Sequence, residues 1–232
     1  INGGSINIAS TTGNITINGI IDSLGKSGNG GLISIAGKTQ TDSIGALISS
    51  EGLSQGGVIN LGQINNLSNG STLAPPANAP PALTTFVNSA TQNNTNSFTV
   101  LSQATNLNSN SGISASSVNG NGGQIYIAGN DSLNTAAQIQ SNGSNGGLII
   151  LSSPAGIYQN TGYIQTNGGA GLGGTIAQSG LISTSLMGAI VEANGQQGGG
   201  NILVGRDFKT NTLPGSATQR SEERRVGKEC LR

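Results

Sequence analysis

Two short stretches of this chain have nearly the same sequence. Residues 29–37 read NGGLISIAG, and residues 121–129 read NGGQIYIAG. Both contain a pair of glycines followed by aliphatic residues at every second position. This pattern occurs seven times in the chain. The second glycine of each copy is Gly4, Gly31, Gly57, Gly123, Gly147, Gly174 and Gly200. The steps between copies are 27, 26, 66, 24, 27 and 26 residues, so all but one step indicate a repeat of about 26 residues.

The aliphatic residues of the repeat keep a spacing of two. The second position after the glycine pair is isoleucine in every copy, and the fourth is aliphatic in every copy except at Gln178. Because side chains alternate between the faces of a strand, both positions face the same side. We predict that Ile125 and Ile149 face one interior, stacked in adjacent coils. The residues expected to point outward are Val58, Asn60, Gln124 and Tyr126.

A second aliphatic landmark follows the glycine pair by sixteen or seventeen residues. Its members are Ile21, Leu47, Ile139, Ile164 and Ile190, each two places after Gly or Ala. A turn that ends in glycine comes next, at Gly25, Gly52, Gly143, Gly168 and Gly195. Each repeat therefore contains two or three short strands joined by tight turns, in which Gly and Asn tolerate left-handed backbone.

These units predict an all-β fold, a right-handed parallel β-helix with coils of about 24–27 residues. Glycine every few residues disfavours helices. One unit cannot bury its own isoleucine face, so neighbouring units must stack. Parallel crossovers are almost always right-handed. Propeller blades need about 40 residues, and leucine-rich repeats need regular leucines, so neither fits.

The 66-residue step exceeds one repeat by about forty residues. The excess falls on residues 68–108, which contain four of the six prolines. We predict that this segment is a long loop projecting from the shaft, between β-helix coils at 1–67 and at 109–219. Long loops are often functional. An insertion without a binding role remains the alternative.

The charged residues are concentrated in the last thirteen positions. Residues 220–232 hold five of the nine basic residues, three of the nine acidic residues and the only cysteine, Cys230. The stretch RSEERRVGKEC at 220–230 resembles the translation of a widely used sequencing adapter. We expect 220–232 to be an unstructured tail that is absent from the natural gene. The first 219 residues then carry four basic and six acidic side chains.

The composition argues against most kinds of chemistry. The chain has no His for a catalytic triad or a zinc site, and its acids are scattered. Asp22 and Glu51 are the nearest pair, but they lie about two positions out of register. The glycine-rich segment 168–174 has no Asp to bind calcium, and we interpret it as a turn. No glycine-rich stretch has a P-loop ending, and the few basic residues argue against nucleic acid as a partner.

We therefore predict no enzyme activity and no catalytic, cofactor-binding or metal-binding residues. Arg206 and Asp207 flank the end of a predicted strand. We interpret them as a local ion pair rather than as a functional site. Tyr126, Tyr158 and Tyr163 would form a sugar-binding stack if they lay together on the surface, but capping of coils is the simpler role.

The last repeat, GAIVEANGQQGGGNILVGRDFKTNTLPGSATQ at 188–219, resembles the repeats of filamentous-haemagglutinin-like exoproteins of bacterial two-partner secretion. The matching residues are Glu192, Ala193, Gly195, Gly198–Gly200, Val204, Gly205, Asp207, Phe208 and Pro214. The resemblance covers most of 1–219 and is weak in the insertion. The N-terminal secretion domain of that family is not recognisable here.

The resemblance implies a fragment of the shaft of a large adhesin at the bacterial cell surface, associated with the outer membrane. It implies an outer-membrane transporter as partner of the full-length protein, and glycans or proteins of host or neighbouring cells as ligands. Two alternatives remain at this point. One is a polysaccharide-degrading β-helix enzyme, and the other is the stalk of a contact-dependent toxin-delivery exoprotein.

Overall fold

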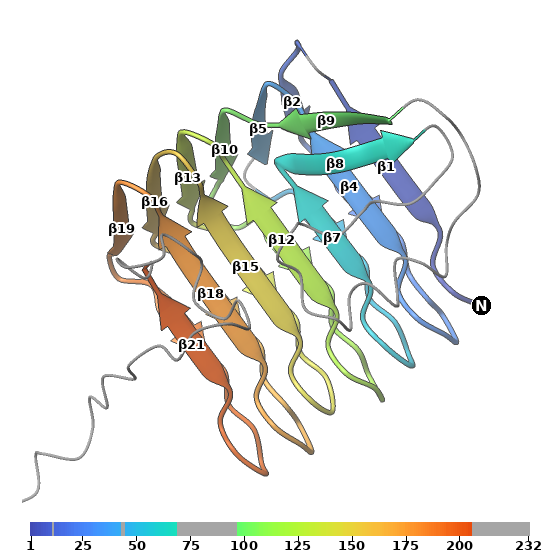
Figure 1. The fold of residues 1–232 in the computed structure, drawn as a ribbon. Helices are drawn as coiled ribbons and strands as arrows, with labels where there is room; N and C mark the ends of the chain where they lie inside the picture. Colours follow the sequence, from blue (N-terminus) through green and yellow to red (C-terminus); the bar gives the residue numbers. More distant parts are fainter. Residues whose placement is uncertain (11, 43–44, 69–96, 206–232) are drawn as a thin grey trace, which may run out of the picture.

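The computed structural model describes residues 1–10, 12–42, 45–68 and 97–205. They form twenty-one strands and, within these ranges, no helix. Nineteen strands build three parallel sheets (Figure 1). Sheet A contains β1 (Ser5–Ala9), β4 (Leu32–Ala36), β7 (Val58–Leu61), β12 (Gln124–Ala128), β15 (Leu148–Ser153), β18 (Thr175–Gly180) and β21 (Asn201–Val204).

Each of the other two sheets has six strands. Sheet B contains β2 (Ile15–Ile17), β5 (Thr39–Asp42), β10 (Ala104–Leu107), β13 (Ser132–Thr135), β16 (Ile157–Asn160) and β19 (Ser183–Leu186). Sheet C contains β3 (Ile20–Asp22), β6 (Leu47–Ser49), β11 (Gly112–Ser114), β14 (Gln138–Gln140), β17 (Tyr163–Gln165) and β20 (Ile190–Glu192).

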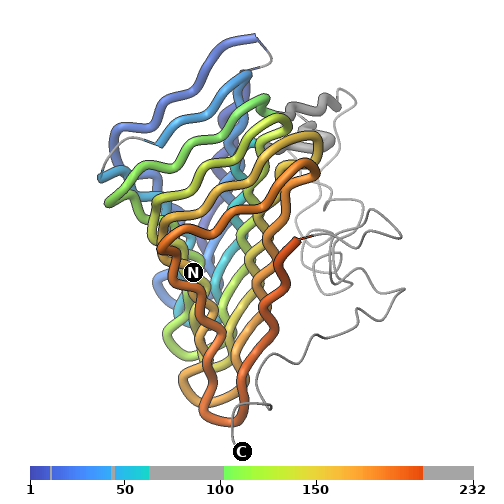
Figure 2. The backbone as a smooth tube through the Cα atoms, turned by 90° about the vertical axis from the view of Figure 1, so that its left-hand side faces the viewer, coloured from blue at the N-terminus to red at the C-terminus, as the bar shows by residue number. Residues whose placement is uncertain are grey.

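The chain passes through sheets A, B and C in turn and then begins the next coil. Strands β4, β5 and β6 form one such coil, and equivalent strands of successive coils are hydrogen-bonded neighbours. Figure 2 shows the coils lying one behind another, from the blue N-terminal coil to the orange C-terminal one. The fold is the predicted right-handed parallel β-helix.

The face of sheet A that points into the shaft carries a continuous row of stacked isoleucines, which we call the aliphatic ladder. Ile125 on β12 is the register partner of Ile149 on β15, and both side chains are fully buried in one core cluster. Ile33 and Ile59 extend the same ladder in the preceding coils, and Ile176 extends it in the following one. The predicted inward direction of Ile125 and Ile149 is confirmed.

The five residues of the second landmark were expected to occupy equivalent strand positions. In two copies, Leu47 and Ile190, the structure shifts the alignment by one residue. Leu47 pairs with Ile20, and both lie on the outer face of sheet C, 38% and 73% exposed. The inward residue of β6 is Ile48, the partner of Ile21. Likewise Ile190 is 55% exposed, and Val191 packs against the core. A shift of one residue reverses the face in a strand, and adjacent aliphatic residues hid the shift.

The outer face of sheet A carries an apolar patch that the sequence did not predict. Val58 and Tyr126 lie between inward neighbours on their strands, as expected, but they are only 4% and 6% exposed. They form a cluster separate from the interior, against which Leu32, Leu148 and Ile150 pack. Asn60 on the same face is also buried, whereas Gln124 is half-buried. The predicted face is therefore right, but three of the four residues are not solvated.

The paired glycines are needed where consecutive coils come closest. A Cβ atom on Gly146 would overlap the carbonyl oxygen of Thr166, and one on Gly147 would overlap the carbonyl oxygen of Gly123. The Oγ of Ser141 also fills this space and donates a 2.8 Å hydrogen bond to the Gly123 carbonyl. Bonds of the same kind join Ser23 to Gly4 and Ser50 to Gly31. The glycine pair thus reflects close approach of the backbone.

The long repeat diverges from the coil at Gly62. This residue has a φ of 73°, and β8 (Gln63–Ser68) follows it directly. Strand β8 pairs antiparallel with β9 (Ser97–Leu101), and Ser102 N–H then donates to the Gly62 carbonyl and closes the coil. Strand β10, within the segment 68–108 assigned to the loop, pairs with β5 and β13 and belongs to the shaft. Residues 69–96 of the predicted loop lie outside the described residues, as does the tail 220–232.

Candidate functional site

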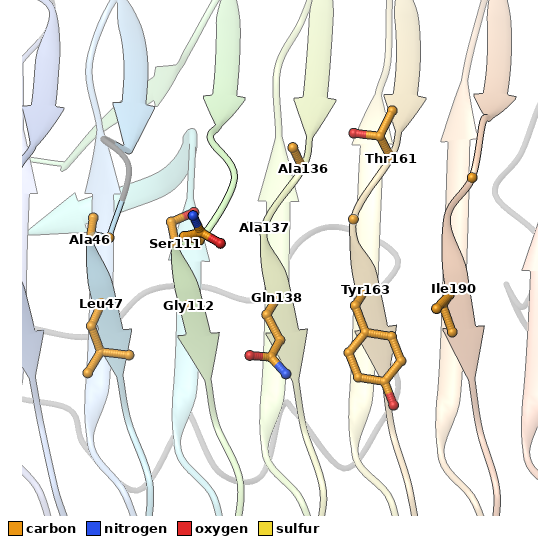
Figure 3. A pocket seen from close by; sticks show the side chains of 14 residues that line it. Ala46, Leu47, Ser111, Gly112, Ala136, Ala137, Gln138, Thr161, Tyr163 and Ile190 are labelled. Atoms are coloured by element: carbon orange, nitrogen blue, oxygen red, sulfur yellow. The ribbon is translucent and has the colours of Figure 1, made fainter.

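A shallow groove follows the turns between sheets B and C (Figure 3). It has a volume of about 540 Å³ and crosses five coils. Each coil contributes equivalent turn positions, and the lining residues are Gly45, Ala46, Leu47, Asn110, Ser111, Gly112, Ala136, Ala137, Gln138, Thr161, Gly162, Tyr163, Gly188 and Ile190. None of them is charged, so the groove suits an uncharged ligand better than an ionic one.

The groove is hollow because the turns are built from small residues. Gly45 and Gly188 have φ values of 81° and 71°, and Asn110 takes the equivalent left-handed position at 62°. Ala46 and Ala137 then turn into the core and are 2% and 1% exposed. The sequence predicted small residues before the second landmark, but not that stacking them would produce a groove.

The outer face of sheet C borders this groove and carries a polar cluster. The Tyr163 hydroxyl lies 2.6 Å from Glu192 Oε2 and 2.9 Å from Gln165 Oε1. Asn167 Nδ2 donates to the same Gln165 oxygen at 3.1 Å. The hydrogen bond to Glu192, with burial and the negative charge adding to it, raises the pKa of Tyr163. The phenol therefore keeps its proton at neutral pH and serves as a donor.

The three tyrosines do not form a stack. Tyr126 lies in the outer patch of sheet A, Tyr158 is fully buried in the core, and only Tyr163 is beside the groove. Burial raises the pKa of both Tyr126 and Tyr158. The predicted role as coil caps is wrong for Tyr158, because its ring fills the interior where other coils place smaller side chains.

A buried polar network joins sheets A and B inside the shaft. Gln178, the exception in the aliphatic pattern, accepts from Tyr158 Oη at 2.7 Å and from Asn160 Nδ2 at 3.2 Å. Thr135 Oγ1 donates to Asn160 Oδ1 at 3.0 Å. All four side chains are buried. Sheet B thus supplies donors for Gln178 Oε1, which the sequence pattern did not reveal, whereas Gln178 Nε2 is buried without a partner.

Sequence reasoning counted Asp42 among the scattered acids and missed its position. Its side chain is fully buried between its register partners Ile17 and Leu107, and neither carboxyl oxygen has a hydrogen-bond partner. Burial raises the pKa of Asp42 to about 7, and the side chain of Gln40 opposes the shift. Because no substrate can reach this carboxyl, it affects stability rather than chemistry.

The acidic pair that the sequence placed nearest, Asp22 and Glu51, is offset in the structure. Asp22 is the register partner of Ser49, so Glu51 lies two positions beyond it, as predicted. Glu51 accepts a hydrogen bond from Ser114 Oγ. Among the described residues, no group of three or more acidic, His or Cys side chains is placed to hold a metal ion. Arg206, Asp207 and Cys230 lie outside these residues.

The glycine-rich segment 168–174 forms the turn between β17 and β18, as interpreted from the sequence. Gly168 bridges Gly143 and Gly195 in the neighbouring coils. The backbone N–H of Leu172 donates to Asn145 Oδ1 at 2.9 Å.

Comparison with known proteins gave no relative. No family model, no curated protein and no solved structure matches the chain. In the described part of the chain, no helix is long and apolar enough to span a membrane. The candidate site therefore rests on geometry alone.

Proposed function

We propose that this chain is a segment of the shaft of a large bacterial adhesin, secreted or displayed on the cell surface. One observation carries the proposal: an aliphatic ladder in constant register runs through seven strands of sheet A. Each coil is buried by its neighbours, so coils can be added without changing the fold. Such a structure holds a binding region away from the cell that produces it.

The sides of the shaft support an adhesive contribution. The groove presents amide, hydroxyl and aromatic groups without charge, from Gln138, Thr161 and Tyr163 among others. These groups match glycans or uncharged protein surfaces on a host or neighbouring cell. Export through an outer-membrane transporter belongs to the same proposal and rests on the sequence resemblance.

The proposal is tested in the source bacterium with the complete parent gene. Antibodies against residues 97–205 should label intact cells, and protease added outside should remove the signal. Deleting residues 124–147, one coil in register, should leave surface labelling unchanged. Signal found only after the cells are lysed would contradict surface display.

The enzyme alternative has a separate test. Purified chain is incubated with pectin, with and without calcium, and reducing or unsaturated ends are measured. We expect no release. Release that is lost on Asp22→Ala or Glu51→Ala would favour the enzyme, whereas release that both variants retain would point to a contaminant.

A further inference from the structure

Asparagine followed by glycine recurs in the turns that lead from sheet C to sheet A. Asparagine deamidates most readily before glycine, which has no side chain to hinder attack by its own backbone nitrogen. The chain contains ten such pairs, and six of them have a described coil on each side. The asparagines of these six pairs are Asn29, Asn119, Asn121, Asn142, Asn145 and Asn167.

The fold protects five of the six pairs. In each of the five, the glycine N–H donates a hydrogen bond to a backbone carbonyl of the following coil. These bonds, 2.7–3.1 Å long, run from Gly30 to Gln55, from Gly122 to Asn145, from Gly143 to Asn167, from Gly146 to Leu172 and from Gly168 to Asn194. A glycine nitrogen held in this way attacks the preceding side chain only after two coils separate locally.

The pair Asn119–Gly120 is the exception. Gly120 N–H donates to Oγ of Ser117, in its own turn, at 3.0 Å. A serine hydroxyl releases such a bond by rotating its side chain, a fast motion that needs no movement of the backbone. The turn is also longer here, because eight residues lie between β11 and Gly123, whereas six lie between β14 and Gly147. The extra length accounts for a glycine that is held locally rather than by the next coil.

The side chain of Asn119 is less restrained than those of its counterparts. It is exposed, and within the described ranges it makes no hydrogen bond. The counterparts are held by other coils through their amide oxygens. Asn121 Oδ1 accepts from Asn145 Nδ2 at 2.9 Å, and Oδ1 of Asn142, Asn145 and Asn167 each accepts a backbone N–H. Both reacting groups are therefore freer at this pair than at the other four.

We propose that Asn119 is a site of spontaneous deamidation in the folded shaft. Hydroxide removes the proton from Gly120 N–H, and the nitrogen forms a bond to Cγ of Asn119. The bond from Cγ to Nδ2 breaks, and the amide group leaves as ammonia after taking a proton from water. Water then opens the succinimide to aspartate or isoaspartate. Water and hydroxide are the only reactants, and the reaction is independent of the adhesive role proposed above.

The product changes both the charge and the backbone of the shaft. From β9 to β21 the described chain has two charged side chains, Asp131 and Glu192, so one new carboxylate is a large change there. Isoaspartate also lengthens the main chain by one methylene group where it is anchored on both sides. Asn119 N–H donates to the Leu53 carbonyl at 2.9 Å, and its carbonyl accepts from Ser144 Oγ at 2.8 Å. Isoaspartate should loosen both contacts.

The test is peptide mapping by mass spectrometry of the full chain, kept folded at pH 8 and sampled over several weeks. Fragmentation of the peptides assigns each deamidation to one asparagine. Asn119 should react at least about fivefold faster than Asn121, Asn142, Asn145 and Asn167, the factor that one net hydrogen bond supplies. In urea all five should react at similar rates, because all five precede glycine. Rates that are equal in the folded chain, or a difference that persists in urea, would overturn the proposal.

Two serine variants test the cause. Ser117→Ala removes the acceptor of Gly120 N–H and should raise the rate at Asn119 by about two- to fivefold. Ser116→Ala is the matched control, since its hydroxyl accepts from Asn142 N–H instead, and it should leave the rate at Asn119 unchanged. Circular dichroism should show the wild-type thermal transition for both variants. A rate at Asn119 that the folded Ser117→Ala variant does not raise would also overturn the proposal.

Discussion

The inner faces of sheets A and B differ in chemistry although the same coils form them. In sheet A the inward residues are almost all aliphatic, as in Ile125 and Ile149. In sheet B the inward positions include Gln40, Asp42 and Asn160, all fully buried. The comparison indicates that a stack of coils needs one regular apolar face. The inner face of sheet B also holds polar side chains, some with partners, as for Asn160, and some without, as for the carboxyl of Asp42.

The largest expected effect comes from placing a charged residue on the inner face of sheet A. Ile149→Asp buries a charge with no partner among Ile125, Leu151 and Ile176, and it should cost at least about 4 kcal/mol of unfolding free energy. Chemical denaturation measures this. Gln138→Asp on the exposed outer face of sheet C is the control and should change stability by less than about 0.5 kcal/mol. Similar stability of the two variants would show that the register is wrong.

The second-largest effect is expected from replacing Asp42, whose carboxyl has no partner on the inner face of sheet B. The pKa of Asp42 is about 7 in the folded state, above its usual value near 4, so the folded protein holds a proton that the unfolded chain has released. Stability should therefore fall as pH rises from about 4 to 7 and then level off. Asp42→Asn should flatten this profile and add about 2–4 kcal/mol at pH 8.

Thermal unfolding across this pH range tests the prediction. Asp42→Leu, which restores an aliphatic residue between Ile17 and Leu107, should gain at least as much at pH 8. An unchanged pH profile in Asp42→Asn would show that this carboxyl is solvated.

A smaller effect is expected at Gln178, the polar residue on the otherwise aliphatic inner face of sheet A. Gln178→Leu should destabilise the protein by about 1–2 kcal/mol, because Tyr158 and Asn160 lose their acceptor. In a Tyr158→Phe background the same change should cost less, and a double-mutant cycle measures the difference. Additive effects would mean that the hydroxyl does not contribute to holding Gln178.

The smallest effect is on the outer polar cluster. Tyr163→Phe removes the hydroxyl beside Glu192 but keeps the ring at the groove, so it should cost less than about 1 kcal/mol. Tyr163→Ala removes the ring as well. In an adhesion assay with the parent protein, a defect from Tyr163→Ala that Tyr163→Phe does not share would assign the contact to the ring.

Sheet A could be predicted from the sequence because its residues alternate and its glycine pairs mark the start of each strand. Sheet B could not, since strands such as TQTD at 39–42 have no apolar periodicity and read as polar linkers. The partner of Gln40 Oε1, the N–H of Gly62, comes from the next coil and cannot be seen in the local sequence. The one-residue error at Leu47 has another cause. Leu47 and Ile48 are adjacent aliphatic residues, so the sequence alone does not show which of them faces the core.

The groove was beyond sequence reasoning for a related reason. Its residues are ordinary turn residues, and only the stacking of five turns hollows the surface. The sequence did anticipate that Asp22 and Glu51 are offset, because that depends on repeat spacing alone. Properties of the repeat were thus predictable, whereas properties that arise between repeats were not.

The central claim is that the shaft consists of interchangeable coils in register, and deletion of one whole coil tests it most directly. Removing residues 124–147 joins Gly123 to Leu148 and should place Ile59 against Ile149. Thermal unfolding followed by circular dichroism should show a β-rich protein with a cooperative transition, at a lower midpoint than the parent. Removing only residues 124–135, half a coil, should abolish that transition. Loss of folding in the whole-coil deletion, or equal stability of the two deletions, would contradict the account.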